Sequence, residues 1–139
     1  MKELIRTVMF VMLAGVVLSA QDTKDPIDKN LDACLNSPAG ASTAGQSECA
    51  SKAYAAWDAE LNKTFQKLLK TLDPASRELL RASQRQWLVF FEAEKKFQGG
   101  PWSRQQGTLG GVTAALANVD IVKNRTLTLR NYSGGGNPN

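Results

Sequence analysis

The sequence predicts an all-α domain, built as an antiparallel bundle of three long helices preceded by a short N-terminal helix. Apolar residues recur at steps of three and four along three separate stretches, which is the period of an amphipathic helix. Two turn signals, Asp73-Pro74 and Gly99-Gly100-Pro101, separate these stretches. No segment shows the alternation of apolar and polar residues that is typical of a half-buried strand.

Residues 1–20 have the pattern of a secretory signal peptide. A basic start is followed by an apolar run that is shorter than the roughly 20 residues needed to span a membrane. Small residues then precede a polar segment, and we predict cleavage after Ala20. The mature protein is therefore expected in the periplasm or outside the cell, with no membrane attachment. Its formal net charge is +3 instead of +4, because the leader carries two basic residues and one acidic residue.

Residues that cap or break helices predict where the first helices begin and end. The predicted domain spans residues 21–132. A short helix around residues 27–35 comes first. The first long helix is predicted to start at a capping box formed by Thr43 and Gln46. It ends at Asp73-Pro74, where Asp is expected to cap the second long helix and Pro to be its first residue.

Glycine and proline mark the end of the second long helix, at Gly99-Gly100-Pro101, where we expect a glycine in the left-handed conformation. A third long helix is expected from Leu109 onwards, and the tail 133–139 is predicted to be disordered because it has nothing to bury. The turn between the first two long helices is very short. We therefore expect them to be adjacent and antiparallel, with Trp57 facing Phe90.

The sequence contains two cysteines, Cys34 and Cys49. An even number of cysteines in an exported chain favours a disulfide, here between the short helix and the start of the first long helix. Closing this loop should stabilise the fold by roughly 3 kcal/mol. Two free buried thiols are the alternative.

Residues suited to catalysis are scarce. The chain has no histidine, which removes the commonest general base and the commonest metal ligand. We predict no catalytic residue, no metal site and no cofactor. Acidic residues gather at the open end of the predicted hairpin, at Asp58, Glu60, Glu92 and Glu94. Residues two apart on a helix point in different directions, so ion pairs or solvated carboxylates are expected here in preference to a catalytic pair.

Basic residues gather around the Asp73-Pro74 turn, at Lys63, Lys67, Arg77, Arg81 and Arg85. Like charges four residues apart slightly destabilise a helix, so helix stability does not explain this cluster. A solvated helix face is one interpretation. Recognition of an acidic protein or an anionic wall polymer is the other. Nucleic acid is not an expected partner, because no exposed aromatic residues are interleaved with the basic ones.

The spacing of several residues resembles a known family. The pattern runs from Cys49 to a Leu61-Asn62 pair followed by an aromatic residue, and then through Gln84-Arg85-Gln86-Trp87 to Glu92. It is similar to the lysozyme-inhibitor LprI-like family of bacterial envelope proteins, over about residues 34–130. The resemblance implies a small exported helical protein that inhibits lysozyme by protein contact and is not an enzyme.

The resemblance places the family motif at Asn62, Gln84, Trp87 and Glu92. Asn62 and Gln84 are nearly opposite in the predicted hairpin, so a buried hydrogen-bonded pair is one interpretation and a partner surface presenting Glu92 is the other.

A lysozyme-type muramidase is the implied partner of the acidic end, although the mature charge of +3 would not steer the protein toward a basic lysozyme. An envelope accessory protein that uses the basic cluster is one alternative. A carboxylate-based enzyme acting on peptidoglycan is another, and it would need two carboxyls about 5 to 9.5 Å apart.

Overall fold

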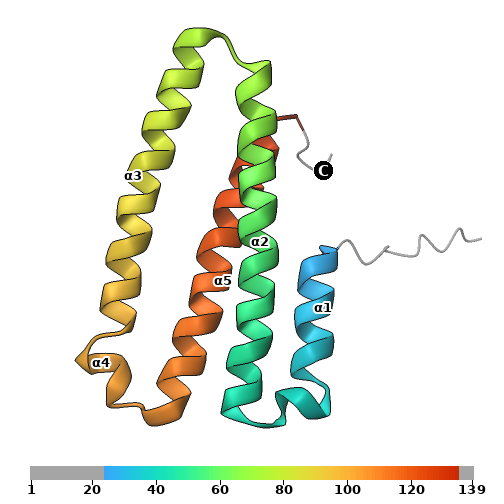
Figure 1. Ribbon diagram of the computed structural model, residues 1–139, viewed down its shortest axis with the longest axis vertical. Helices are drawn as coiled ribbons and strands as arrows, with labels where there is room; N and C mark the ends of the chain where they lie inside the picture. The colour runs from blue at the N-terminus through green and yellow to red at the C-terminus, as the bar shows by residue number, and fades with distance from the viewer. Residues whose placement is uncertain (1–23, 135–139) are drawn as a thin grey trace, which may run out of the picture.

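The computed structural model describes residues 24–134, and every regular element in this range is a helix. The order is α1 (Pro26–Leu35), the 3-10 helix η1 (Pro38–Ala41), α2 (Thr43–Thr71), α3 (Pro74–Gln98), α4 (Pro101–Arg104) and α5 (Gly107–Tyr132). The predicted all-α architecture of three long helices and a short N-terminal helix is confirmed (Figure 1). The predicted leader 1–20 lies outside the described residues, as does most of the predicted tail.

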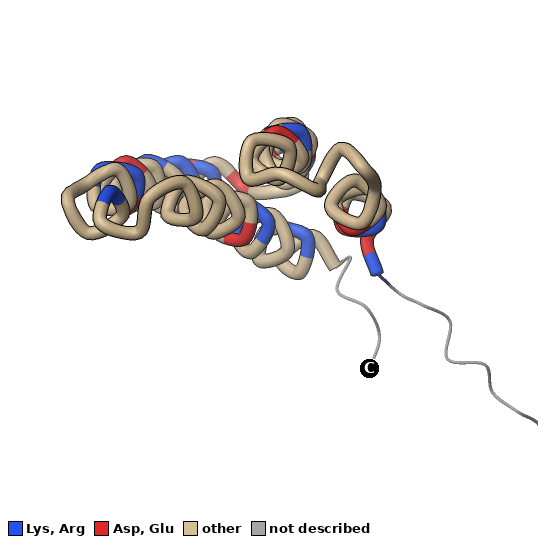
Figure 2. The backbone as a smooth tube through the Cα atoms, turned by 90° about the horizontal axis from the view of Figure 1, so that it is seen from below, with Lys and Arg blue, Asp and Glu red and all other residues tan. Residues whose placement is uncertain are grey.

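The closest helix pair is α2 and α5, which forms the centre of the molecule. On one side α1 lies against α2, and on the other side α3 occupies the opposite edge, connected to α5 through α4 (Figure 1). The view from below also places α1 and α3 at opposite edges, and it shows charges of both signs spread over the helices (Figure 2). Within residues 24–134, no helix is both long enough and apolar enough to cross a membrane.

The hydrophobic core lies mainly between α2 and α5. Its buried members on these two helices are Ala50, Ala53, Trp57, Leu61, Leu68, Leu69, Val119, Val122 and Leu129. From α3, only Leu80 and Phe91 belong to the buried core. Because α5 has neighbours on more than one side, its apolar residues do not form a single stripe.

The two long helices α2 and α3 are antiparallel, but they move apart with distance from the Asp73-Pro74 turn (Figure 1). Trp57 faces α1 instead of α3, and its indole N–H donates to the Asp28 carboxylate at 3.3 Å. Phe90 is 50% exposed, so the predicted contact between Trp57 and Phe90 is wrong. Phe91 takes the inward position, with its ring stacked on Tyr54 of α2 at 6.2 Å between centroids.

The disulfide is formed as predicted between Cys34 and Cys49, whose Cα atoms are 5.7 Å apart. Cys34 lies near the end of α1, and Cys49 is buried in the second turn of α2. The bridge therefore ties α1 to α2 at the end of the molecule opposite the Asp73-Pro74 turn (Figure 1).

Helix caps agree with the sequence at α3 and differ by one residue at α2. The Asp73 carboxylate accepts a hydrogen bond from the backbone N–H of Ser76 at 3.0 Å, with Pro74 as the first helical residue. In α2, Ser42 is the cap, and its hydroxyl accepts from the N–H of Gly45 at 3.0 Å. The predicted capping box starting at Thr43 is wrong, because the chain has already entered the helix at that residue.

The connection from α3 to α5 also differs from the prediction. Gly99 has a φ of −83°, so it is not left-handed, and the chain passes directly into α4. The last long helix starts at Gly107, two residues earlier than predicted. A Cβ on Gly110 would lie 2.2 Å from the carbonyl oxygen of Ser103, so α4 and α5 approach each other too closely for any side chain at this position.

Candidate functional site

The four acidic residues predicted to form one surface are divided. Glu60 turns toward α5, where its carboxylate pairs with Arg130 at 2.9 Å and lies 3.5 Å from the Lys63 ammonium. Asp58 lies one turn after Tyr54 on α2, and Glu92 pairs with Lys95, which lines the same groove as Tyr54. Both carboxylates raise the pKa of the Tyr54 hydroxyl. Glu94 follows Glu92 by two residues and points to a different side of α3. Only Asp58 and Glu92 therefore remain as a common acidic surface.

Tyr54 lies in a groove at the end of the molecule where α3 has moved away from α2. We call it the Tyr54 groove, and its volume is about 290 Å³. Three helices line it, through Ala50, Ser51, Tyr54, Lys95, Ala115 and Asn118. Two of these residues come from α5, and this helix is visible between α2 and α3 in Figure 1.

Charges around the Tyr54 groove are unbalanced in favour of anions. Burial raises the pKa of Tyr54, Asp58 and Glu92 raise it further, and Lys95 lowers it. The Lys95 ammonium pairs with the Glu92 carboxylate at 2.5 Å and lies 4.9 Å from the centre of the Phe91 ring. The hydrogen bond to Glu92 raises the pKa of Lys95. Two carboxylates thus face one ammonium.

Asn118 adds an unused hydrogen-bond acceptor to the groove. Its side-chain oxygen Oδ1 is buried and has no hydrogen-bond partner among residues 24–134. A buried acceptor without a partner costs about 1–3 kcal/mol unless water or a bound donor satisfies it. Together with the carboxylates of Asp58 and Glu92, this oxygen makes the region suited to a cationic donor such as a lysine or arginine side chain.

Basic residues near the Asp73-Pro74 turn do not form one surface either. Arg81 and Arg85 line a groove of about 340 Å³ between α2 and α3, and Arg81 also pairs with Glu78 at 2.5 Å. The Nε atom of Arg77 donates to the backbone carbonyl of Leu72 at 2.7 Å, which satisfies the end of α2. We therefore interpret Arg77 as a structural residue and not as part of a binding surface.

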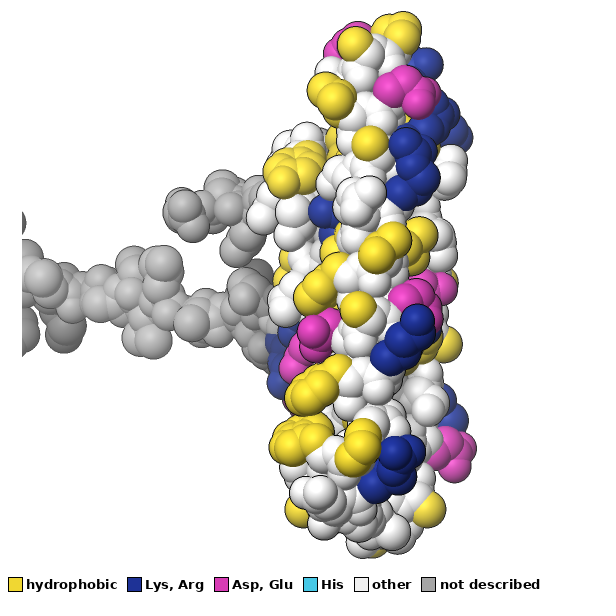
Figure 3. Space-filling model, turned by 90° about the vertical axis from the view of Figure 1, so that its left-hand side faces the viewer, with side chains coloured by type: hydrophobic (Ala, Val, Ile, Leu, Met, Phe, Trp, Pro, Cys, Tyr) yellow, Lys and Arg dark blue, Asp and Glu magenta, His cyan; other side chains and the backbone are white. Residues whose placement is uncertain are grey.

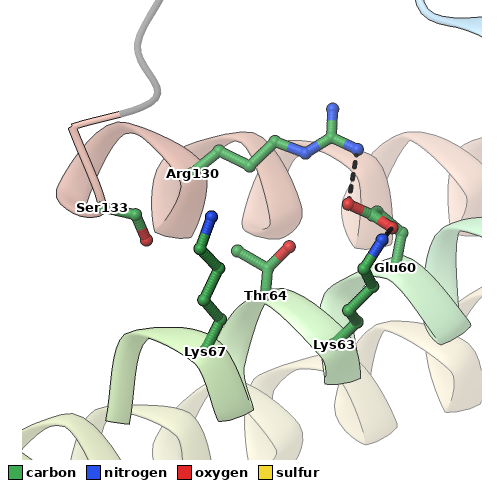
Figure 4. A pocket seen from close by; sticks show the side chains of 6 residues that line it. All are labelled: Glu60, Lys63, Thr64, Lys67, Arg130 and Ser133. Atoms are coloured by element: carbon green, nitrogen blue, oxygen red, sulfur yellow. Dashed lines mark ion pairs between the residues drawn. The ribbon is translucent and has the colours of Figure 1, made fainter. Parts of the chain in front are cut away.

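The two lysines of the basic cluster line a separate cavity between α2 and α5, which we call the Lys67 cavity (Figure 4). Its volume is about 270 Å³, and its lining residues are Glu60, Lys63, Thr64, Lys67, Arg130 and Ser133. The side chains of Lys67 and Ser133 point toward one another across it (Figure 4). Lys67 forms no ion pair with any residue between 24 and 134.

Arg130 at this cavity is held by two carboxylates. Its guanidinium pairs with Asp25 at 2.7 Å and with Glu60 at 2.9 Å, and its central carbon lies 5.3 Å from the centre of a Trp57 ring. Burial lowers the pKa of Arg130, but the hydrogen bonds to both carboxylates raise it above its ordinary value. This group joins α1, α2 and α5, so we interpret it as structural.

Of the two interpretations of the family motif, the hydrogen bond between Asn62 and Gln84 is absent from the structure. Asn62 is exposed, and its amide donates to the backbone carbonyl of Asp58 at 3.0 Å. The side-chain oxygen of Gln84 accepts from Nε of Arg125 at 3.0 Å, and Arg125 also donates to Ser83 at 3.1 Å. This interpretation was wrong because Gln84 turns toward α5 and not toward α2.

Trp87, another motif residue, is half-buried, and its ring stacks on Phe91 at 5.3 Å between centroids. Tyr54, Lys95 and Asn118 are not among the site residues predicted from the sequence. Asn118 carries the clearest signal, because a lone amide in the mostly apolar stretch 112–122 indicates a polar site. Tyr54 was hidden within the apolar stripe of α2.

Comparison with known proteins identifies the chain. The family described as "Lysozyme inhibitor LprI" matches residues 34–129, which is more than half of the chain. The chain belongs to this LprI lysozyme-inhibitor family. The resemblance predicted from the motif between Cys49 and Glu92 is therefore confirmed.

A solved relative of this LprI-family protein also exists. The crystal structure of an uncharacterized protein from Burkholderia thailandensis is 33% identical and superposes with a TM-score of 0.72. The match covers 81% of the present chain and 58% of the Burkholderia chain. The present chain therefore spans less than two thirds of the length of this relative. No curated protein matches.

Proposed function

We propose that this protein is an exported inhibitor that binds a lysozyme-type muramidase by protein contact and catalyses no reaction of its own. The match to the lysozyme-inhibitor family over residues 34–129 is the observation that carries this proposal. Export is supported by the leader pattern of residues 1–20 and by the two cysteines that form a disulfide.

The contact surface in this proposal is the Tyr54 groove together with Asp58 and Glu92. A basic partner presents lysine and arginine side chains, and this region offers two carboxylates and the unpaired oxygen of Asn118. The Tyr54 ring adds an aromatic surface for a cation. Local charge, and not the net charge of the molecule, then attracts the partner.

Lys95 plays a particular part in this arrangement, because its ammonium already pairs with Glu92. A partner cation must compete with Lys95 for that carboxylate. Replacing Lys95 by a neutral side chain of similar length removes the competitor and leaves both carboxylates in place. We therefore expect stronger inhibition of the muramidase when the positive charge of Lys95 is removed.

The experiment measures inhibition of muramidase-driven lysis of cell walls by the wild type and by three variants. Lys95→Met should strengthen inhibition, and Asp58→Asn should weaken it. Lys70→Met is the matched control, because Lys70 is also exposed but lies at the end of α2 near the Asp73-Pro74 turn. It makes the same change in net charge, so any effect of overall charge appears in both lysine variants.

Two results would contradict the proposal. If the wild-type protein inhibits no muramidase, the proposed inhibitor function is wrong. Weaker inhibition by Lys95→Met, with Lys70→Met unchanged, would instead mean that the groove receives an anionic group. The surface proposal would then fail while the inhibitor function survived.

One observation favours a second candidate function, that of an accessory protein for an acidic partner or anionic wall polymer. The Lys67 cavity contains an ammonium that makes no ion pair within the described chain. Binding of an anionic wall polymer that is lost in Lys67→Ala and retained in Lys70→Ala would support this alternative. Equal binding of the polymer by the two variants would contradict this second candidate function.

A further inference from the structure

One face of α3 is largely apolar and exposed, and within the described chain Trp102 stacks on it at its Phe97 end. Along it lie Leu79, Ala82, Gln86, Phe90, Ala93 and Phe97, which we call the α3 stripe. Leu79 is 73% exposed, Phe90 50% and Phe97 58%, whereas Leu80 and Phe91 point into the core. Apolar side chains are visible along this helix when it faces the viewer (Figure 3). A stripe of this length on the surface of a small protein is typical of an interaction site.

We propose that the α3 stripe binds the α3 stripe of a second copy of this chain in an antiparallel, two-fold symmetric pair. A symmetric interface of this kind must be complementary to itself. Spacings of three and four residues keep the stripe on one side of the helix along its whole length. The proposal is independent of the inhibitory function.

Apolar residues of the stripe match each other in this arrangement. When the two-fold axis is level with residue 88, Leu79 lies opposite Phe97 of the second copy, and Ala82 lies within one residue of the level of Ala93. Near the axis, Gln86 lies opposite Phe90. The Phe97 ring also stacks on Trp102 at 5.4 Å between centroids, which widens the apolar surface that receives Leu79.

Charges beside the stripe select the antiparallel direction. Glu78 of one copy lies within two residues of the level of Lys96 of the other, about 3 Å along the helix axis, which the long side chains can span, and symmetry makes this pair twice. In a parallel two-fold pair, the two copies of this flank would lie on opposite sides of the seam, so Glu78 of one copy could not reach Lys96 of the other. Lys96 has no ion pair with residues 24–134, and the pair of Glu78 with Arg81 is exposed and contributes little.

The size of the interface indicates a reversible dimer. Helix α3 has 25 residues and is about 37 Å long, so a single helix pair buries less surface than a standard interface. We therefore expect dissociation in the micromolar range. The Tyr54 groove is lined by Lys95, on the other side of α3 from Phe90 and Phe97, and it stays open in the dimer.

The first experiment follows mass against concentration by analytical ultracentrifugation, using protein recovered after export. The wild type should show a monomer–dimer equilibrium. Phe90→Glu should weaken dimerisation by about tenfold or more, because it places a carboxylate in the apolar contact of each copy. Tyr132→Glu is the control, since Tyr132 is 64% exposed at the end of α5 and outside the stripe, and its dimer should equal that of the wild type.

The second experiment reverses the flanking charges, and both positions are exposed so that the fold is retained. Glu78→Lys and Lys96→Glu should each weaken the dimer several-fold, and the combined variant should restore it. A protein that stays monomeric over the whole concentration range overturns the proposal. So does a dimer that resists Phe90→Glu, or single charge variants that the combination does not rescue.

Discussion

The two edges of the molecule are held in different ways. On the α1 side, Trp57 is fully buried, its N–H is bonded to Asp28, and Arg130 and the disulfide join three helices. On the α3 side, Leu80 and Phe91 supply the buried apolar contacts, and the opposite face of the helix is exposed. Most of the buried contacts therefore join α1, α2 and α5, which leaves surfaces of α3 available for contacts with other molecules.

The largest expected effect tests this division directly. Trp57→Ala should lower the free energy of unfolding by about 3–5 kcal/mol, because it leaves a large cavity between α1, α2 and α5. Phe90→Ala, which shortens an exposed aromatic residue on α3, should change it by less than about 0.5 kcal/mol at concentrations where the protein is monomeric. Urea denaturation measures both, and equal losses would show that the two edges contribute alike.

Removing the disulfide should have the next largest effect. A Cys34→Ser, Cys49→Ser variant frees the 15-residue separation that the bridge closes and should lose about 3 kcal/mol. Thermal unfolding followed by circular dichroism measures the change. Adding a reductant should lower the melting temperature of the wild type and leave that of the variant unaltered. The same melting temperature for both proteins would mean that α1 is held without the bridge.

A smaller, pH-dependent effect is expected from Asp25 and Arg130. Burial by itself raises the pKa of Asp25, but the hydrogen bond and the charge of Arg130 bring it below its ordinary value of 3.8. The folded pKa is therefore lower than the unfolded pKa. The resulting stability is present above pH 3.8 and is lost as the pH falls through the folded pKa.

Arg130→Gln should accordingly destabilise the protein by about 1.5–3 kcal/mol near neutral pH, because it removes charged hydrogen bonds to Asp25 and Glu60. The difference between wild type and variant should shrink in acid. Urea denaturation at several pH values tests this. A difference that stays constant down to acid pH would contradict the assignment to Asp25.

The smallest expected effect concerns the groove beside α3. The chain has two tyrosines, so in a Tyr132→Phe variant Tyr54 is the one phenol whose ionisation changes the ultraviolet absorbance. Asp58→Asn should lower the pKa of Tyr54 toward its ordinary value of 10.0, because one of the carboxylates that raise it is removed. Ultraviolet absorbance at alkaline pH measures the titration. Glu94→Gln should leave it unchanged, and equal shifts from the two variants would refute the grouping of Asp58 with Glu92.

The sequence indicates which acidic residues are candidates for a binding surface, but not which of them lie together in the fold. Asp58 and Glu92 both act on Tyr54, but Glu60, which is close to Asp58 in sequence, belongs to the Arg130 network on the other side of α2. Charge patterns along a helix do not show which neighbour each side chain meets. Arg125, which takes the place predicted for Asn62 beside Gln84, lies 41 residues away in sequence.

The short N-terminal helix, the three long helices, the turn at Asp73-Pro74, the disulfide partners and the family could all be predicted from the sequence alone. These depend on local periodicity, on cap and breaker residues, and on a cysteine pair with one possible connection. The close pairing of α5, and not of α3, with α2 and the exposure of an apolar face of α3 became evident only from the packing of the folded chain. The physical reason is that hydrophobic attraction has no direction. Periodicity shows which face of a helix is apolar, but the packing of the whole chain selects the helix that covers it.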